Sequence, residues 1–143
     1  MELTTSQKGE IAKLKTEIRA IEKGWVASRT VESARYDLIL DDGEKAYRVQ
    51  VKYASTPFGH CKGAVTANLR RHQGDDRNLK YRRQSMRTYD DSEVDAIIIY
   101  IPQVDKLCWF GPEHFKDKVA IHVRYEKSGN NQTNGKQVDD FQW

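Results

Sequence analysis

The chain has 143 residues, of which 38% are apolar and 31% charged, and its formal net charge is +3. This length fits one folded domain with one core, so we expect a single domain over residues 1–143. The sequence has no N-terminal apolar segment and no run of 18 apolar residues, so we expect no membrane partner and no readable targeting signal.

The first predicted element is a helix over residues 5–23. Its apolar residues recur at helical spacing and predict a buried stripe: Ile11, Leu14, Ile18 and Ile21. Thr4 and Gln7 have the spacing of a capping box, and Gly24 is a natural stop after the helix. Glu10 and Glu17 fall at the edge of the stripe, where a carboxylate can border the core.

The next stretch predicts a short strand over residues 25–29 and then a hairpin. Residues 36–40 are strand-like, residues 41–44 have the Asp-Gly chemistry of a turn, and residues 47–53 alternate between apolar and polar side chains. The hairpin therefore brings Asp37 close to the strand that carries Gln50 and Lys52.

The second half of the chain predicts further strands joined by polar segments. In chain order these are a strand over 64–71, a polar and basic loop or arm over 72–87, a buried strand over 94–101, a strand over 107–110, a helical turn over 111–115, an alternating strand over 119–125, and a polar loop or C-terminal tail from Lys127 onward.

Positive charge is concentrated in one part of the chain. Residues 61–87 hold eight Lys or Arg against two Asp, a net +6 that leaves −3 for the rest. Such an excess is typical of a surface that binds a polyanion; a solvated loop is the alternative. We predict that the basic segment, residues 62–87, contacts the phosphates of a nucleic acid through Arg70, Arg71, Arg77, Lys80, Arg82, Arg83 and Arg87. Tyr81 and Tyr89 interleave with these cations, and aromatic residues within a basic run can stack on bases or pack along a backbone.

The two cysteines suggest where the protein works. Cys61 and Cys108 form neither a CxxC pair nor a ligand spacing with histidine. We expect both thiols to be reduced, which favours an intracellular, cytoplasmic location.

The hairpin offers the groups that phosphodiester hydrolysis requires. That reaction needs a divalent metal at the phosphate, hard oxygen ligands for it, and a cation or base that orients water. Asp37 supplies a carboxylate, and Gln50 and Lys52 point to one face because they lie two residues apart on a strand. The backbone carbonyl of Val51 is a further candidate ligand. Taken separately, Asp37 could be a strand-end turn residue and Lys52 a solvent-facing lysine.

These residues resemble the PD-(D/E)XK nuclease motif, with Tyr36 in the place of the proline and Gln50 in the place of the second acid. A neutral amide ligates Mg²⁺ more weakly than a carboxylate does, which leaves the number of bound metals open. A longer ordered set of segments is similar to the small group I intron-encoded homing endonucleases of this type: Lys8-Gly9-Glu10, Arg35-Tyr36-Asp37, Gln50-Val51-Lys52-Tyr53, Asn68-Leu69-Arg70 and Glu93-Val94-Asp95-Ala96.

The resemblance implies an α/β fold with a restriction-endonuclease-like core, a central mixed β-sheet flanked by α-helices. It further implies Mg²⁺-dependent cleavage of double-stranded DNA by a homo-oligomer, a dimer or a tetramer. On the resemblance, the catalytic residues are Glu10, Asp37, Gln50 and Lys52, and the metal ligands come from Asp37, Val51, Glu10 and Gln50. For Glu10 the alternative is a solvated helix charge, or an acid near the helix cap that the helix dipole favours.

Three other functions remain open from the sequence. The first is a Holliday-junction resolvase or a restriction-type endonuclease of the same fold. The second is a DNA-binding module that has lost catalysis, for which Gln50 would be the sign. RNA binding is compatible with the charge, but no motif favours it over DNA.

Overall fold

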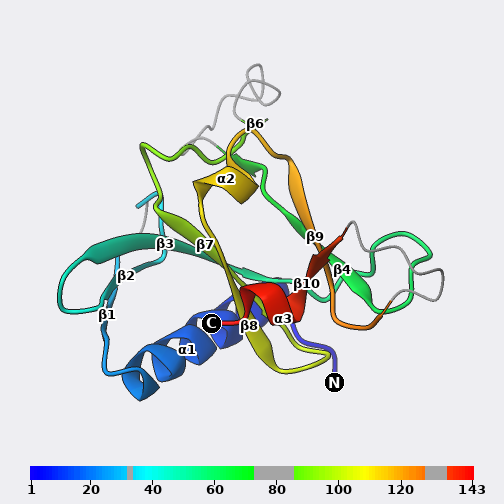
Figure 1. Ribbon diagram of the computed structural model, residues 1–143, viewed down its shortest axis with the longest axis horizontal. Coiled ribbons are helices and arrows are strands. Elements are labelled where there is room, and N and C mark those ends of the chain that lie inside the picture. Colours follow the sequence, from blue (N-terminus) through cyan, green and yellow to red (C-terminus); the bar gives the residue numbers. More distant parts are fainter. Residues whose placement is uncertain (32–33, 73–85, 128–134) are drawn as a thin grey trace.

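The computed structural model of the protein describes residues 1–31, 34–72, 86–127 and 135–143 (Figure 1). Its elements in chain order are α1 (Thr5–Glu22), β1 (Val26–Arg29), β2 (Leu38–Asp41), β3 (Ala46–Tyr53), β4 (Ala64–Asn68), β5 (Arg71–His72), β6 (Met86–Arg87), β7 (Ala96–Ile101), β8 (Lys106–Phe110), α2 (Pro112–Phe115), β9 (Ala120–Arg124), β10 (Lys136–Gln137) and α3 (Val138–Phe141). The fold is therefore of the mixed α/β class predicted.

A five-stranded sheet in the order β1-β2-β3-β7-β8 forms the centre of the molecule. Its strands pair antiparallel except for β3 and β7, which pair in parallel, so the sheet is mixed as expected. Every residue of β7 is buried, because this strand is covered on both faces. The predicted central mixed sheet is therefore confirmed.

The β2–β3 hairpin closes through the predicted turn. The side chain of Asp41 accepts a hydrogen bond from the Gly43 N–H, and that of Asp42 accepts from the N–H groups of Glu44 and Lys45, at 2.7–2.8 Å. Gly43 has a φ of +97°, which favours glycine. Aspartate side chains thus fix the turn, and the turn fixes the pairing of Leu38 with Val49.

Helix α1 lies across one face of the central sheet (Figure 1). Its capping box forms as predicted: the Thr4 hydroxyl accepts from the Gln7 N–H, and the Gln7 side chain accepts from the Thr4 N–H. The small residues Ala12, Thr16 and Ala20 are fully buried against the sheet. They let the helix approach the large side chains that β2, β3 and β7 present on this face.

The predicted buried stripe on α1 is wrong. Leu14, Ile18 and Ile21 are 46%, 53% and 70% exposed, and Ile11 is only partly buried. The face of the sheet under α1 is already filled by Leu38, Leu40, Val49, Val51 and Ile98. Small side chains fit against it better than large ones, so the helix turns its large apolar residues away.

A second layer covers the opposite face of the central sheet. It contains the three-stranded sheet β10-β9-β4 and the short helices α2 and α3. The core between the layers is built from β7 and β8 on one side and from β4, β9 and the helices on the other: Ile97, Ile99, Ile101, Cys108 and Phe110 against Val65, Ala67, Phe115, Ile121, Val123 and Val138. Gln50 and Lys52 project from the central sheet toward this layer.

The expectation of a polar tail from Lys127 is wrong for its last part. Within residues 135–143, β10 pairs in parallel with β9, and α3 buries Val138. Phe141 packs its ring 4.6 Å from that of Phe110. Two apolar residues thus anchor a segment whose polar composition suggested a loop.

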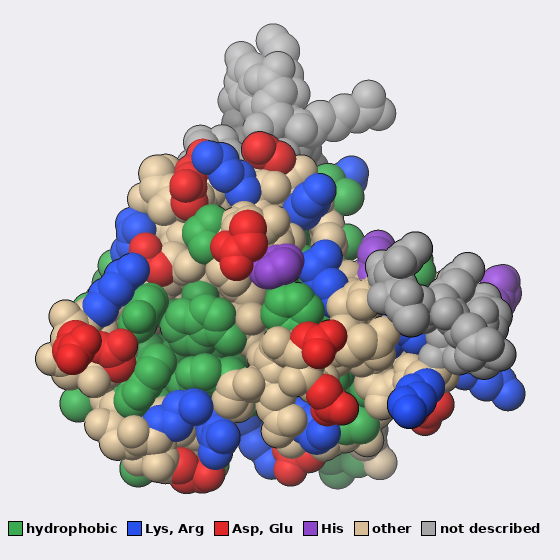
Figure 2. Space-filling view, in the orientation of Figure 1, with side chains coloured by type: hydrophobic (Ala, Val, Ile, Leu, Met, Phe, Trp, Pro, Cys, Tyr) green, Lys and Arg blue, Asp and Glu red, His purple; other side chains and the backbone are tan. Residues whose placement is uncertain are grey.

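Aromatic rings gather where α1, β3 and β8 meet, and Figure 2 shows apolar side chains on that face. Trp25, Tyr47, Trp109 and Trp143 contact one another with ring centroids 5.1–6.1 Å apart. The backbone N–H of Trp143 donates to the carbonyl of Leu107 at 2.9 Å. Trp25 and Trp109 therefore pack against other rings of the protein.

Both cysteines carry free thiols. Cys61 is exposed in the segment between β3 and β4, whereas Cys108 is buried in β8. Burial raises the pKa of the Cys108 thiol to about 12. Among the described residues, no helix is long and apolar enough to cross a membrane.

Candidate active site

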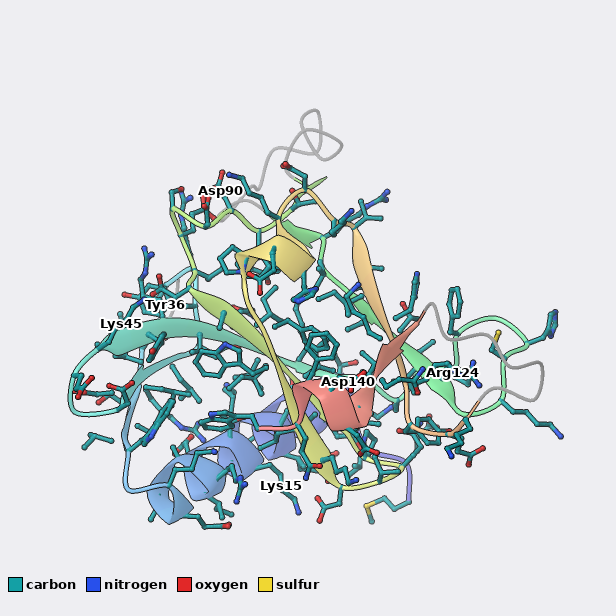
Figure 3. All side chains as sticks on the ribbon, viewed as in Figure 1. Lys15, Tyr36, Lys45, Asp90, Arg124 and Asp140 are labelled. Carbon is teal, nitrogen blue, oxygen red and sulfur yellow. The ribbon has the colours of Figure 1, made fainter. Side chains whose placement is uncertain are left out.

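The site is built around the start of β2, where the chain passes from Tyr36 to Asp37 (Figure 3 labels Tyr36). The Asp37 N–H donates to the carbonyl of Val49 at 2.9 Å, which ties the aspartate to β3. The Asp37 Oδ2 accepts a hydrogen bond from the Val51 N–H, also at 2.9 Å. The carboxylate therefore lies against the peptide group that joins Gln50 to Val51.

Gln50 and Lys52 lie on the same face of the central sheet. In the parallel pairing of β3 with β7, Gln50 is opposite Ile97 and Lys52 is opposite Ile99. Val49 and Val51 instead belong to the core under α1. Gln50 and Lys52 thus share one face, as predicted from the sequence. The structure adds that this face lies away from α1.

The carbonyl of Val51 points to the side of β3 that faces β2, where Asp37 lies. In a strand the N–H and C=O of one residue point to the same side, and the Val51 N–H meets the Asp37 carboxylate. One carboxylate, one backbone carbonyl and the amide of Gln50 thus come from adjacent positions. This donor set fits Mg²⁺, which prefers oxygen ligands and takes one or two carboxylates with water and phosphate.

Lys52 extends over the ring of Tyr89, with its Nζ 5.2 Å from the ring centroid. Tyr89 is only 3% exposed and belongs to the core between the two layers. The expectation that Tyr89 stacks on bases is therefore wrong, because its faces are covered by protein. Tyr81 lies outside the described residues.

Glu10 belongs to α1, on the other face of the sheet. Its carboxylate pairs with Arg29 at 2.7 Å and with Lys13 at 3.4 Å, and Arg29 also binds Glu17 at 2.7 Å. The hydrogen bond from Arg29 lowers the pKa of Glu10 below its usual value. The described residues contain no group of three or more His, Cys, Asp or Glu that could hold a metal. A role for Glu10 as a ligand would require Arg29 to share or release it.

Two ion pairs brace the strands around the site. Arg48 donates to both oxygens of Asp95 from its side chain, at 3.0 Å, and from its backbone N–H at 2.8 Å. The hydrogen bonds from Arg48 lower the pKa of Asp95. Arg35 pairs with Glu93, whose side chain is 11% exposed. Sequence reasoning missed both pairs, because they join residues almost fifty or more positions apart; the polar side chain of Arg48 on the Gln50 face was the available signal.

The predicted DNA-binding residues are described only in part. Arg70 is exposed after β4, and its N–H donates to the Asn68 side chain at 2.9 Å. The backbones of Arg71 and Arg87 lie opposite each other in the β5–β6 pair. The other four fall outside the described residues: Arg77, Lys80, Arg82 and Arg83.

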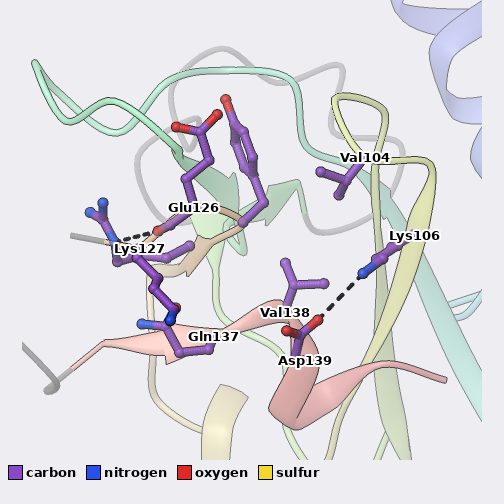
Figure 4. A pocket seen from close by; sticks show the side chains of 9 residues that line it. Val104, Lys106, Glu126, Lys127, Gln137, Val138 and Asp139 are labelled. Carbon is purple, nitrogen blue, oxygen red and sulfur yellow. Dashed lines mark hydrogen bonds and ion pairs between the residues drawn. The ribbon is translucent and has the colours of Figure 1, made fainter. Parts of the chain in front are cut away.

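A small pocket opens elsewhere, between the end of β9 and the β10–α3 segment (Figure 4). Lys106 and Asp139 form an ion pair across one side of it at 3.3 Å. The Arg124 Nε donates to the carbonyl of Glu126 on the other side at 3.2 Å. The lining groups already bind one another, and they come from other elements than β2 and β3.

Three comparisons with known proteins show what the chain is similar to. A family model described as PD-(D/E)XK endonuclease matches residues 3–143. The structure is similar to that of I-Ssp6803I, a bacterial homing endonuclease, with a TM-score of 0.75, 20% identity, and coverage of 98% of this chain and 89% of that one. A Holliday junction resolvase of the archaeon Archaeoglobus fulgidus, Hjc, matches with a TM-score of 0.48 and 11% identity, over 82% of this chain and 84% of that one. Among curated proteins, no sequence matches the chain.

Proposed function

Because the chain belongs to the PD-(D/E)XK endonuclease family, we propose that it is a site-specific, homing-endonuclease-like enzyme that hydrolyses double-stranded DNA with Mg²⁺. The observation that carries this proposal is the contact of the Asp37 carboxylate with the Val51 N–H. That contact brings the carboxylate to the strand whose polar residues Gln50 and Lys52 share one face of the sheet.

In the proposed mechanism, Asp37, the Val51 carbonyl and the Gln50 amide would hold the metal. Glu10, which α1 carries on the other face of the sheet, would join them as a further ligand once Arg29 shares or releases its carboxylate. When bound, Mg²⁺ neutralises charge that develops on the scissile phosphate. Lys52 orients the attacking water and stabilises negative charge with its ammonium group. The Nζ of Lys52 lies 5.2 Å from the centroid of the Tyr89 ring, a cation–π contact that holds the side chain over that ring.

We assign DNA contact to the basic segment, whose arginine-rich charge suits phosphates. One copy supplies one set of these catalytic residues, so cutting both strands requires two copies, and a two-fold homo-oligomer is the economical assembly. The free thiols of Cys61 and Cys108 are compatible with a reducing, intracellular setting.

The test compares Lys52→Ala with Lys45→Ala, an exposed lysine on the β2–β3 turn. We expect Lys52→Ala to lower the cleavage rate by about 10²–10³-fold, the usual effect of removing one positioned electrostatic group, while DNA affinity changes little. Lys45→Ala should cut at the wild-type rate. A Lys52→Ala protein that cleaves at the wild-type rate would contradict the proposal.

The substrate is identified by incubating the wild-type protein with a random plasmid library and sequencing the ends. Ends at a recurring sequence in Mg²⁺, and none in EDTA, are the expected result. Binding without cleavage in Mg²⁺ would indicate a DNA-binding module instead. Faster cleavage of four-way junctions than of linear duplex would indicate a resolvase.

A further inference from the structure

Helix α1 presents its largest apolar side chains to solvent. Leu14, Ile18 and Ile21 are 46–70% exposed, whereas Ala12, Thr16 and Ala20 on the sheet side are fully buried. At about 100° per residue, the two sets lie on nearly opposite sides of the helix. Outside the sheet contact, α1 therefore carries an apolar stripe about three turns long: Ile11, Leu14, Ile18 and Ile21. The described residues leave the last three exposed, whereas Ile11 is partly buried against the core under α1.

The spacing of the stripe matches that of a helix that packs on another helix. Its residues follow one another at intervals of three, four and three, which are the a and d positions of two heptads. These intervals are the same in both directions along the chain. If the α1 helix of a second copy runs antiparallel to the first, Ile11 therefore aligns with Ile21 and Leu14 with Ile18. A two-fold axis between the helices repeats each of these pairings once.

Charges beside the stripe agree with this alignment. Lys8 of one helix would lie close to Glu22 of the other, on the same side of the apolar contact. The two-fold axis generates this pair of opposite charges twice. Nearer the axis, Lys15 of one copy would approach Lys15 of the other, and Glu17 would approach the second Glu17. Both are already neutralised within the chain, Lys15 by Asp105 at 2.8 Å and Glu17 by Arg29 at 2.7 Å.

We propose that the outer face of α1 is the contact between two copies of this chain, which pack their α1 helices antiparallel about a two-fold axis. The inference rests on the homo-oligomer of the proposed function and deepens it by naming its surface. Its test measures assembly in the absence of DNA and metal, so it stands or fails independently of cleavage.

The first experiment measures the mass of the full chain in solution by sedimentation velocity. Ile18→Lys places a charge at the centre of the stripe, and we expect it to halve the mass of the wild-type assembly. The control is Val119→Lys, an apolar residue 50% exposed at the far layer, which should leave the mass unchanged. A wild-type protein that is monomeric, or an Ile18→Lys protein with the wild-type mass, would overturn the proposal.

A second experiment tests the antiparallel alignment and does not depend on a drastic substitution. Lys8→Glu should raise the dissociation constant of the assembly several-fold, because it sets like charges opposite Glu22. The double variant Lys8→Glu with Glu22→Lys should restore the wild-type constant. Loss of affinity in both variants would show that these residues do not face each other and would exclude this alignment.

Discussion

The carboxylate of Asp37 has two oxygens, and the fold engages one of them. Oδ2 accepts the hydrogen bond of the Val51 N–H just before β2 begins, so the side chain takes the place that a backbone carbonyl has further along the strand. Asp37 thus stabilises the pairing of β2 with β3 in addition to its proposed contact with the metal. A useful set of substitutions must distinguish the effect on stability from the effect on cleavage.

We predict that Asp37→Asn and Asp37→Ala both abolish Mg²⁺-dependent cleavage but differ in stability. The Asn side chain keeps an oxygen that can accept from Val51, so its free energy of unfolding should stay near that of the wild type. The Ala variant leaves a donor in β3 without that acceptor and should lose about 1 kcal/mol or more. Urea unfolding of the three proteins measures the difference; equal stability of the two variants would refute the stabilising role of Asp37.

At this scale the sequence predicted some contacts and not others. Strand alternation suffices to place Gln50 and Lys52 on one face, and the hairpin turn suffices to bring Asp37 to them. The pairing of Glu10 with Arg29 was not predictable in this way, because it depends on how β1 crosses α1. The burial of Tyr89 was hidden by the charged residues around it in the sequence.

At the scale of elements, α1 shows what a periodic pattern can and cannot establish. The predicted range of 5–23 agrees with Thr5–Glu22, because caps and spacing depend on local sequence. The buried face does not agree, because it depends on the space that the sheet leaves. Close approach of α1 to β3 requires small residues, and these carry no hydrophobic signal of their own.

The fit of α1 to the sheet leads to a prediction about its small residues. Ala20→Leu should destabilise the fold by about 1–3 kcal/mol, because extra side-chain volume in a packed contact forces strain. The neighbouring substitution Ile21→Leu, at a position 70% exposed, should change stability by less than about 0.5 kcal/mol. Thermal or urea unfolding at low protein concentration provides the comparison. An Ala20→Leu protein as stable as the wild type would show that the contact between α1 and the central sheet can accommodate a larger side chain.

The strands were predictable where composition and turn chemistry agree, as in the β2–β3 hairpin and in β7. The β10–α3 segment was not, since Val138 and Phe141 are isolated within a polar stretch. Their burial comes from the parallel pairing of β10 with β9. Such pairing between distant segments leaves no periodic pattern in the sequence.

For the whole molecule, the distribution of charge matters more than its sum. Residues 61–87 carry a net +6 and the remainder −3. A protein with this division should bind DNA through one region only. Its affinity should fall steeply with salt, because binding to phosphates releases counterions.

We predict that Arg82→Ala with Arg83→Ala lowers the slope of log affinity against log salt by about 0.9 for each phosphate that the variant no longer neutralises. Lys118→Ala with Lys127→Ala removes the same charge from exposed positions outside the basic segment and should leave the slope unchanged. Fluorescence anisotropy over a salt series measures both. Identical slopes for the two double variants would show that this pair of arginines does not bind phosphate.

The difference in exposure between the two thiols allows the protein to be labelled at one cysteine. Cys108 is buried with a pKa of about 12, and Cys61 is exposed, so a maleimide dye should attach to the native protein at a single place. That place adjoins the start of the basic segment. The wild-type chain can thus carry a fluorophore at Cys61 that reports DNA binding to the basic segment, with Cys61→Ser as the unlabelled reference.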